Sequence, residues 1–89
     1  MKKRKLQWDL DAWEDYLYWQ KQDKKTVSKI NRLIKDVLRT PFEGLGEPEA
    51  LKNRLSGYWS RRIDGVNRLV YLVEDEVVVI MACKGHYDD

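Results

Sequence analysis

The C-terminal stretch Lys-Gly-His-Tyr-Asp-Asp contains the only histidine of the chain, His86, followed directly by Tyr87. Imidazole changes its protonation state near neutral pH, so a histidine at the end of a strand-like segment is a candidate proton-transfer group. Other candidates precede it, namely cations in or beside predicted strands and carboxylates in a predicted loop. The cations are Lys52, Arg54, Arg61, Arg62 and Arg68, and the carboxylates are Glu43, Glu47 and Glu49.

These residue types together suit the cleavage of RNA without a metal ion. A general base must accept the 2′-hydroxyl proton, cations must stabilise the charge that develops on the phosphorane oxygens, and an acid must protonate the leaving 5′-oxygen. A positioned acid or base contributes about 10²–10⁴-fold, and preorganised electrostatic stabilisation is usually the largest single contribution. Arginine suits this task because its guanidinium fork matches phosphate oxygens and stays charged.

The residues alone leave other interpretations open. Ser56 and Ser60 occur without a Gly-x-Ser-x-Gly motif or a second histidine, which argues against a serine hydrolase, and the chain has no Gly-rich phosphate-binding loop. Cys83 and His86 have no further cysteine or histidine to complete a ligand set, so we expect neither a metal site nor a cofactor. By spacing alone, a generic nucleic-acid-binding or protein-binding domain is favoured over a nuclease, and the simplest alternative is solvated arginines with a frayed tail.

The composition indicates one small domain spanning residues 1–89. Charged residues make up 36% of the chain, yet the net charge is only +2 because acidic and basic clusters offset each other. Cys83 is the single cysteine, which excludes an intrachain disulfide and fits a reducing cytoplasm. The sequence contains no apolar run near the ~20 residues that a membrane span requires. We therefore expect a cytoplasmic protein with no membrane partner.

Two helices are predicted in the N-terminal half, after a short strand candidate at residues 5–8. Apolar and aromatic residues at helical spacing indicate a first helix over residues 10–21, which Asp9 caps. A broader apolar stripe follows Asp23, a second N-cap, and continues to Thr40-Pro41, where the proline ends the helix. The opposite face of this second helix is cationic.

The C-terminal half changes to short strand patterns. Predicted strands cover residues 51–55, 58–63, 68–75 and 77–85, and the turn signals between them include Ser-Gly and Asp-Gly. Tight turns join antiparallel neighbours. We therefore expect an α+β fold, in which an N-terminal strand and a helical hairpin pack on a mostly antiparallel twisted sheet.

Alternation along the strands divides the charged residues between two faces of this sheet. Over residues 58–63, Arg62 shares one face with Tyr58 and Ser60. Arg61 shares the opposite face with Trp59 and Ile63, which resemble core residues. Because the helices can cover only one face, we expect the other face to be open, concave and cationic.

Several motifs together resemble the YoeB/Txe family of toxins, in the RelE superfamily of bacterial toxin–antitoxin systems. The motifs are DYLYWQ, KINxLIKD, TPFEGxGxPExLK, SGxWSRRI, RLVY and a terminal HY, and the resemblance runs from Trp8 to Tyr87. It implies a RelE-like microbial RNase fold. It also implies a ribosome-dependent endoribonuclease, an mRNA interferase that cleaves mRNA in the A site with the 2′-hydroxyl as nucleophile.

The resemblance further implies partners for the protein. A cognate YefM-like antitoxin would bind and block the toxin, and the pair would repress its own operon, so that operator DNA is contacted only through the complex. The 70S ribosome and mRNA would be the other partners, and we expect a homodimer. Ribosomal RNA phosphates are the expected contact of the cationic helix face, whose lysines are Lys24, Lys25, Lys29 and Lys35.

The family's acid–base residues fall on three positions of this chain. Glu49, within the motif Gly-Glu-Pro-Glu-Ala-Leu-Lys, takes the role of general base. His86 takes the role of general acid, and Tyr87 that of a residue that orients the substrate and stacks on a base.

The family's phosphate-binding residues fall on cations of the same segments. Arg62 and Arg68 correspond to the arginines that stabilise the transition state. Lys52 corresponds to a phosphate-contacting lysine, and Arg61 is expected to bind substrate beside it. No metal is implied.

The chain departs from the family pattern at three places. Ala50 replaces a proline that commonly follows the loop glutamate, and Asn67 stands where a histidine often precedes the arginine. Asp88 and Asp89 follow the terminal His-Tyr, where their carboxylates would favour a protonated imidazole and repel RNA phosphate.

A non-catalytic RelE-like protein, which would act with an antitoxin in DNA repression, is the alternative function. A degenerate member would be expected to lack some of the catalytic residues. This chain retains all six that the resemblance identifies, which favours the enzyme. They are Glu49, Lys52, Arg62, Arg68, His86 and Tyr87.

Overall fold

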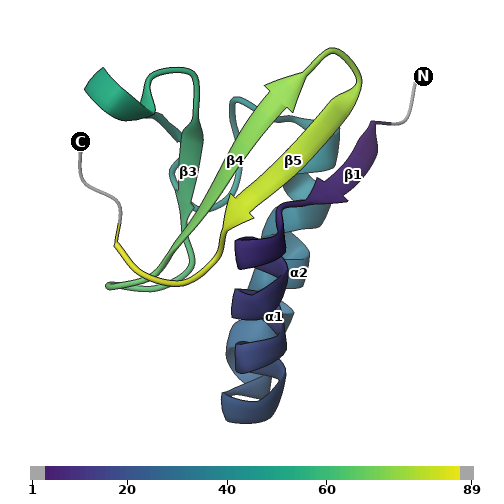
Figure 1. Ribbon diagram of the computed structural model, residues 1–89, viewed down its shortest axis with the longest axis vertical. Coiled ribbons are helices and arrows are strands. Elements are labelled where there is room, and N and C mark those ends of the chain that lie inside the picture. The colour runs from purple at the N-terminus through teal and green to yellow at the C-terminus, as the bar shows by residue number, and fades with distance from the viewer. Residues whose placement is uncertain (1–3, 87–89) are drawn as a thin grey trace.

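A five-stranded sheet in the order β1-β5-β4-β3-β2 carries two helices on one face (Figure 1). The computed structural model describes residues 4–86. The strands are β1 (Lys5–Trp8), β2 (Glu49–Ala50), β3 (Trp59–Arg62), β4 (Arg68–Glu74) and β5 (Val77–Ala82), and the helices are α1 (Leu10–Gln22), α2 (Lys24–Arg39) and a 3₁₀ turn, η1 (Asn53–Leu55). β1 pairs with β5 in parallel, and the other pairs are antiparallel. The predicted α+β fold with a mostly antiparallel sheet is thereby confirmed.

Asp23 both ends α1 and begins α2. Its backbone N–H donates to the carbonyl of Trp19, while its carboxylate accepts from the Lys25 N–H and from the Thr26 N–H and hydroxyl. The Thr26 hydroxyl and these backbone donors lower the pKa of Asp23 below its ordinary value. One aspartate thus makes a hairpin with a one-residue connection, and both helices lie within one residue of the predicted bounds.

The main core lies between the helices and the sheet. α2 buries an apolar stripe against it, as its periodicity predicts. The fully buried side chains of this layer are Ala12, Ile30, Leu33, Val37, Leu69, Tyr71, Val78, Ile80 and Cys83. Leu69 and Tyr71 belong to this layer, and Val70 between them faces the other side of the sheet, as alternation along β4 requires.

The segment after β2 folds back over the other face of the sheet. Leu51, Val70 and Ala82 form a small second cluster there, and Leu55 and Tyr58 pack against it. The predicted strand at residues 51–55 is therefore wrong, because the chain turns at η1 instead. The predicted open face is wrong in part, since this apolar cluster covers some of it.

Hydrogen bonds join the end of β5 to α1. The Trp19 indole donates to the carbonyl of Cys83 at 2.9 Å, and the Cys83 N–H donates to the Asp15 carboxylate at 3.0 Å. Burial, with a smaller contribution from the charge of Asp15, raises the pKa of the Cys83 thiol to about 12. Cys83 is therefore an unreactive core residue, and the strand ends at Ala82 rather than at the predicted residue 85.

Within residues 4–86, neither helix combines the length and the apolarity that crossing a membrane demands.

Candidate active site

Arg62 and Arg68 lie directly opposite each other across β3 and β4. Residues paired in this way point to the same face of a sheet. The next pair along the same face is Ser60 with Val70, and Val70 belongs to the second cluster, away from the helices. Both arginines therefore lie on the face that α1 and α2 leave uncovered.

Glu49 joins the arginines on this face because β2 pairs with β3. Its cross-strand partner is Ser60, two residues before Arg62. The side chains of Glu49, Ser60 and Arg62 therefore have the same orientation. Glu49 is exposed, as is Lys52, which precedes η1. The structure thus brings the predicted base to the same face as the predicted phosphate-binding arginines.

The two arginines differ in how tightly they are held. Arg68 is buried, and its Nη1 donates to the carbonyls of Asp64 at 2.8 Å and Asn67 at 3.1 Å. Arg62 has 51% of its side chain exposed, and its Nε lies 3.3 Å from a carboxylate oxygen of Glu47. An exposed ion pair of this kind is worth little. Arg68 is thus a fixed cation, and Arg62 can leave Glu47 for another anion.

His86 follows a glycine that is bonded to the Arg68 segment. The Arg68 N–H donates to the Gly85 carbonyl at 2.9 Å, and the Gly85 N–H donates to the Asn67 side-chain oxygen at 2.8 Å. His86 is exposed and comes next in the chain. The predicted acid is therefore connected to the arginine face. Tyr87 lies outside the described residues.

Arg61 does not lie with these residues. It is 0% exposed, on the helix-facing side of β3, as the alternation of the strand requires. A guanidinium without solvent access cannot contact a substrate, so the expectation that Arg61 binds substrate is wrong. The sequence motif places two arginines side by side, but only Arg62 is available.

The Arg61 guanidinium donates to five acceptors in the interior. Nε donates to the Tyr71 hydroxyl, Nη1 to the Asp36 carboxylate at 2.6 Å and the Leu45 carbonyl, and Nη2 to the carbonyls of Thr40 and Glu43. Arginine has five N–H groups, and each therefore has a partner here. Three of the acceptors belong to the loop that leads from α2 to Glu49, so Arg61 holds this loop in place.

Asp36 completes the network and was missed by the sequence reasoning, which assigned it to the cationic surface of the second helix. Its carboxylate accepts from the Leu45 N–H at 2.9 Å as well as from Arg61. The Leu45 N–H and the Arg61 guanidinium lower the pKa of Asp36 against the effect of burial. The sequence did contain a signal: Asp36 is the single acidic residue among the lysines and arginines of the predicted second helix, and it lies close to the end of that helix.

Tyr71 and Gly44 show how closely the loop is packed. Burial raises the pKa of Tyr71 despite the nearby guanidinium, so its hydroxyl stays protonated and donates to the Pro41 carbonyl at 2.6 Å. Gly44 has a φ of 120°, and a Cβ there would lie 2.1 Å from an Asp36 oxygen. Only glycine fits this position.

Comparison with known proteins identifies the family. The model of the YoeB-like toxin of bacterial type II toxin–antitoxin systems matches residues 8–87. This chain belongs to the YoeB family. Toxin YoeB of Escherichia coli K12 is 60% identical over 83 residues, which cover 93% of this chain and 99% of that protein. The resemblance that the motifs indicated is confirmed, and the protein is a toxin of a type II toxin–antitoxin system.

Solved structures of this toxin family agree with the fold. A YoeB dimer from Staphylococcus aureus is 47% identical, has a TM-score of 0.89, and covers 97% of this chain and 100% of its own. A heterotetrameric YoeB–YefM toxin–antitoxin complex from the same organism has the same identity and coverage, with a TM-score of 0.86.

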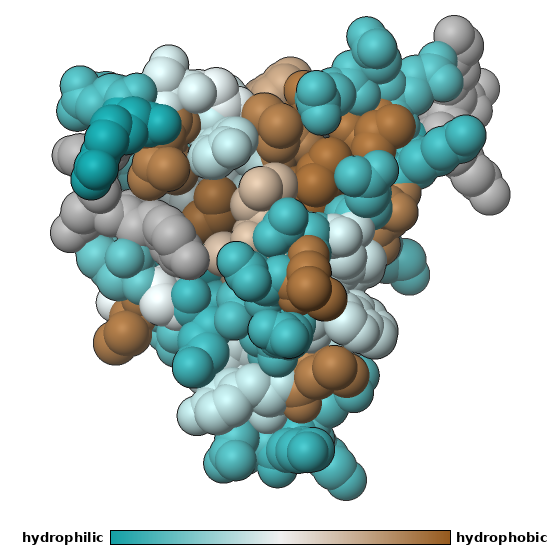
Figure 2. All heavy atoms as spheres, in the orientation of Figure 1, coloured by the Kyte–Doolittle hydropathy of each residue, from teal (hydrophilic) through white to brown (hydrophobic). Residues whose placement is uncertain are grey.

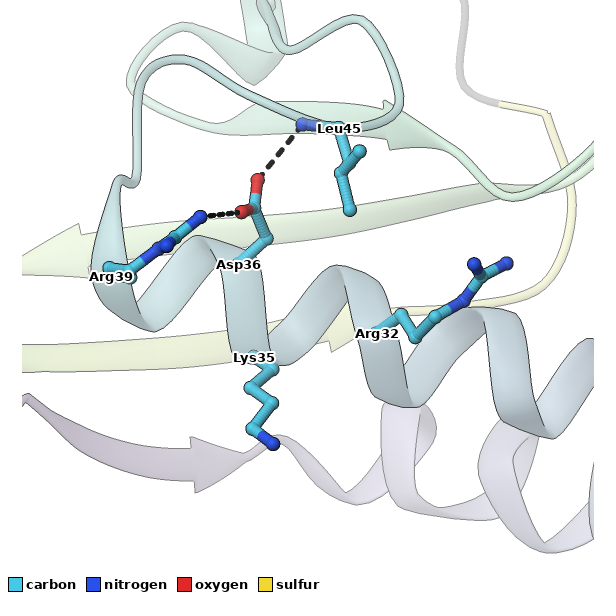
Figure 3. A pocket seen from close by; sticks show the side chains of 5 residues that line it. All are labelled: Arg32, Lys35, Asp36, Arg39 and Leu45. Carbon is cyan, nitrogen blue, oxygen red and sulfur yellow. Dashed lines mark hydrogen bonds and ion pairs between the residues drawn. The ribbon is translucent and has the colours of Figure 1, made fainter.

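This YoeB-family chain also has a cationic groove on α2, on the helix-covered side. A cavity of about 330 Å³ is lined by Arg32, Lys35, Asp36, Arg39 and Leu45. Arg39 turns toward Asp36, with which it pairs at 3.1 Å, whereas Arg32 and Lys35 extend away from it (Figure 3). Among residues 4–86, no group of three or more His, Cys, Asp or Glu side chains is placed to hold a metal ion.

Replacing Arg61 by lysine should destabilise the protein. Lysine has three donors for five acceptors, and each buried acceptor left unpaired costs about 1–3 kcal/mol. We expect the free energy of unfolding, measured by urea titration, to fall by at least about 2 kcal/mol. The matched control is Arg62→Lys, an exposed neighbour, with an expected change within about 0.5 kcal/mol. Equal losses in the two variants would show that Arg61 has no special structural role.

Asp36→Asn should alter both the stability and its dependence on pH. At pH 7 the variant leaves a buried guanidinium without its counter-charge, at a cost of about 3–5 kcal/mol. The folded-state pKa of Asp36 is lowered, so its stabilisation is complete above the unfolded-state value, about 3.9, and is lost as the pH falls through the folded-state value. The wild type should therefore lose more stability than Asp36→Asn between pH 7 and pH 3. Parallel acid profiles would contradict this role.

Proposed function

We propose that this YoeB-family toxin is a ribosome-dependent endoribonuclease, an mRNA interferase that cleaves mRNA in the ribosomal A site. The observation that carries the proposal is the common face of Glu49, Arg62 and Arg68, with His86 bonded to it through Gly85. A base, two cations and an acid on or beside one face of the sheet are what metal-free cleavage of RNA requires.

In the proposed reaction, Glu49 accepts the proton of a 2′-hydroxyl, and the oxygen attacks the adjacent phosphorus. Arg62, Arg68 and Lys52 stabilise the negative charge on the non-bridging oxygens. His86 donates a proton to the 5′-oxygen as its bond to phosphorus breaks. The products are a 2′,3′-cyclic phosphate and a 5′-hydroxyl. Tyr87 is proposed to orient the substrate by stacking on a base.

The two arginines are anchored differently, which supports one phosphate contact of fixed position and one that can adjust. Arg68 is held by two backbone carbonyls and therefore offers a preorganised charge. Arg62 pairs with Glu47 at the surface, a contact that a phosphate can replace at little cost.

The proposed partners follow from the relatives. The YoeB–YefM complex from S. aureus supports a YefM-like antitoxin for this chain. We propose that the pair binds operator DNA and represses its own operon, and that the toxin acts on the 70S ribosome in the bacterial cytoplasm. The cationic face of α2, with its groove at Arg32 and Lys35, is a proposed contact for ribosomal RNA phosphates.

A homodimer is proposed through α1 and β1. Leu10, Trp13 and Leu17 are exposed at positions i, i+3 and i+7, so they share one face of α1, and Leu6 is exposed on β1. Hydrophobic side chains interrupt the hydrophilic surface where α1 lies in front (Figure 2). The YoeB dimer from S. aureus supports this state.

His86→Gln and Glu49→Gln should each slow cleavage about 10²–10⁴-fold, because each removes a positioned acid or base. Primer extension on an mRNA translated in extract would measure the cuts, and co-sedimentation would show that both variants still bind ribosomes. Glu74→Gln removes an exposed carboxylate of β4 and is the matched control, with unchanged cleavage. Wild-type protein that makes no ribosome-phased cuts would refute the enzyme and favour a non-catalytic partner of the antitoxin.

Light scattering should give the mass of two chains for the wild type at micromolar concentration. Leu10→Glu places a charge at a residue that is 68% exposed on α1, and should shift the mass to one chain. Val66→Glu is the control, because Val66 is 65% exposed in the distant turn between β3 and β4. A wild type that is monomeric throughout, or equal effects of the two variants, would argue against this interface.

A further inference from the structure

The turn between β3 and β4 is organised by the carboxylate of Asp64. Oδ1 accepts from the Val66 N–H at 2.8 Å and from the Asn67 N–H at 2.6 Å. The Asn67 side-chain amide nitrogen donates to both oxygens, at 3.2 and 3.0 Å. Burial opposes ionisation of Asp64, but these hydrogen bonds outweigh it and lower its pKa. Asp64 is therefore an anion at neutral pH, and it orients the Asn67 amide.

The other end of that amide reaches the C-terminal segment. With its nitrogen turned to Asp64, Asn67 directs Oδ1 to the Gly85 N–H at 2.8 Å. The reverse orientation of the amide would place a donor against a donor and an acceptor against a carboxylate, so the hydrogen bonds themselves determine it. Asn67 thus links a loop to a segment 18 residues further along the chain.

Gly85 is held on both sides by consecutive residues. The Gly85 N–H donates to the side-chain oxygen of Asn67, and the Gly85 carbonyl accepts from the Arg68 N–H at 2.9 Å. The same turn supplies the carbonyls of Asp64 and Asn67 that fix the Arg68 guanidinium. The position of residue 85, and hence the starting point of His86, is therefore set relative to the fixed cation of the site.

We propose that Asn67 is a positioning residue, whose side-chain amide holds Gly85 and thereby places the His86 imidazole relative to Arg68. This inference rests on the proposed function for its effect on the rate. Asparagine suits the role because one group must accept from a backbone N–H and donate to a carboxylate. A displacement of about 1 Å in a reacting group can cost on the order of 10²-fold in rate.

Asn67→Ala should reduce ribosome-dependent cleavage about 10–100-fold through kcat, with little change in KM. If Asn67 acts through His86, it should have less than about a twofold further effect in the His86→Gln background. Val66→Ala, in the same turn but without a side-chain bond to Gly85, should cleave like the wild type. Wild-type rates in Asn67→Ala, or a full loss that persists in the double variant, would overturn the inference.

A second measurement does not depend on cleavage. The chain has one histidine, so the imidazole signal in a proton NMR spectrum belongs to His86. Asn67→Ala should shift that signal and speed the exchange of the Gly85 amide hydrogen, whereas Val66→Ala should do neither. An unchanged imidazole signal and unchanged exchange would refute the positioning role. Absence of cleavage by the wild type would instead refute the proposed enzyme, while these spectra still decide the role of Asn67.

Discussion

The charge of Arg61 is the constraint on which the rest of the molecule depends. A buried guanidinium is tolerated only when its charge is balanced and its donors are satisfied. Asp36 supplies the counter-charge from α2, Tyr71 a partner from β4, and the 40–45 loop three carbonyls. Helix, sheet and loop must all be in place for this group to be buried. The loop then continues to Gly46, whose carbonyl accepts from the Arg62 N–H, and onward to Glu49 in β2. The position of the proposed base is thus a consequence of an ion pair on the opposite side of the sheet.

Neighbouring residues in β3 have opposite roles because a strand alternates its faces. Arg61 is sealed in the interior and stabilises the fold, while Arg62 lies in solvent and is available to an anion. Arg68, across from Arg62, is buried, and its guanidinium donates to backbone carbonyls of its own turn, so its charge is fixed in place. The proposed site therefore combines one cation of fixed position with one that can adjust.

Most of the fold was predictable from local patterns. Asp23, Pro41 and the apolar stripe of α2 act within a few residues of each other, and β-branched runs with tight turns indicate antiparallel strands. Alternation also places Arg62 on the face opposite the core, but the pairing of β2 with β3, which brings Glu49 to that face, was not predicted because Glu49 was assigned to a loop. The features that the sequence did not predict depend on contacts between residues far apart in the chain. Nothing local shows that Asp36 meets Arg61, that Leu55 folds onto Val70, or that Asn67 binds Gly85. A motif treats Arg61 and Arg62 as equivalent cations, whereas alternation along the strand already places them on opposite faces.

The pairing of β1 with β5 has a consequence for the synthesis of the protein. Lys5 is opposite Val77, so the first strand has to wait for the last one before it gains a partner. Such contacts between distant parts of a chain form slowly, because the chain must first lose the entropy of the long loop between them. His86 follows β5, and Gly85 must reach back to Asn67 and Arg68. Until β5 has been synthesised, β1 and β4 lack the strand that lies between them. The His86 end of the molecule can therefore take shape only after the strands that precede it have been synthesised and paired.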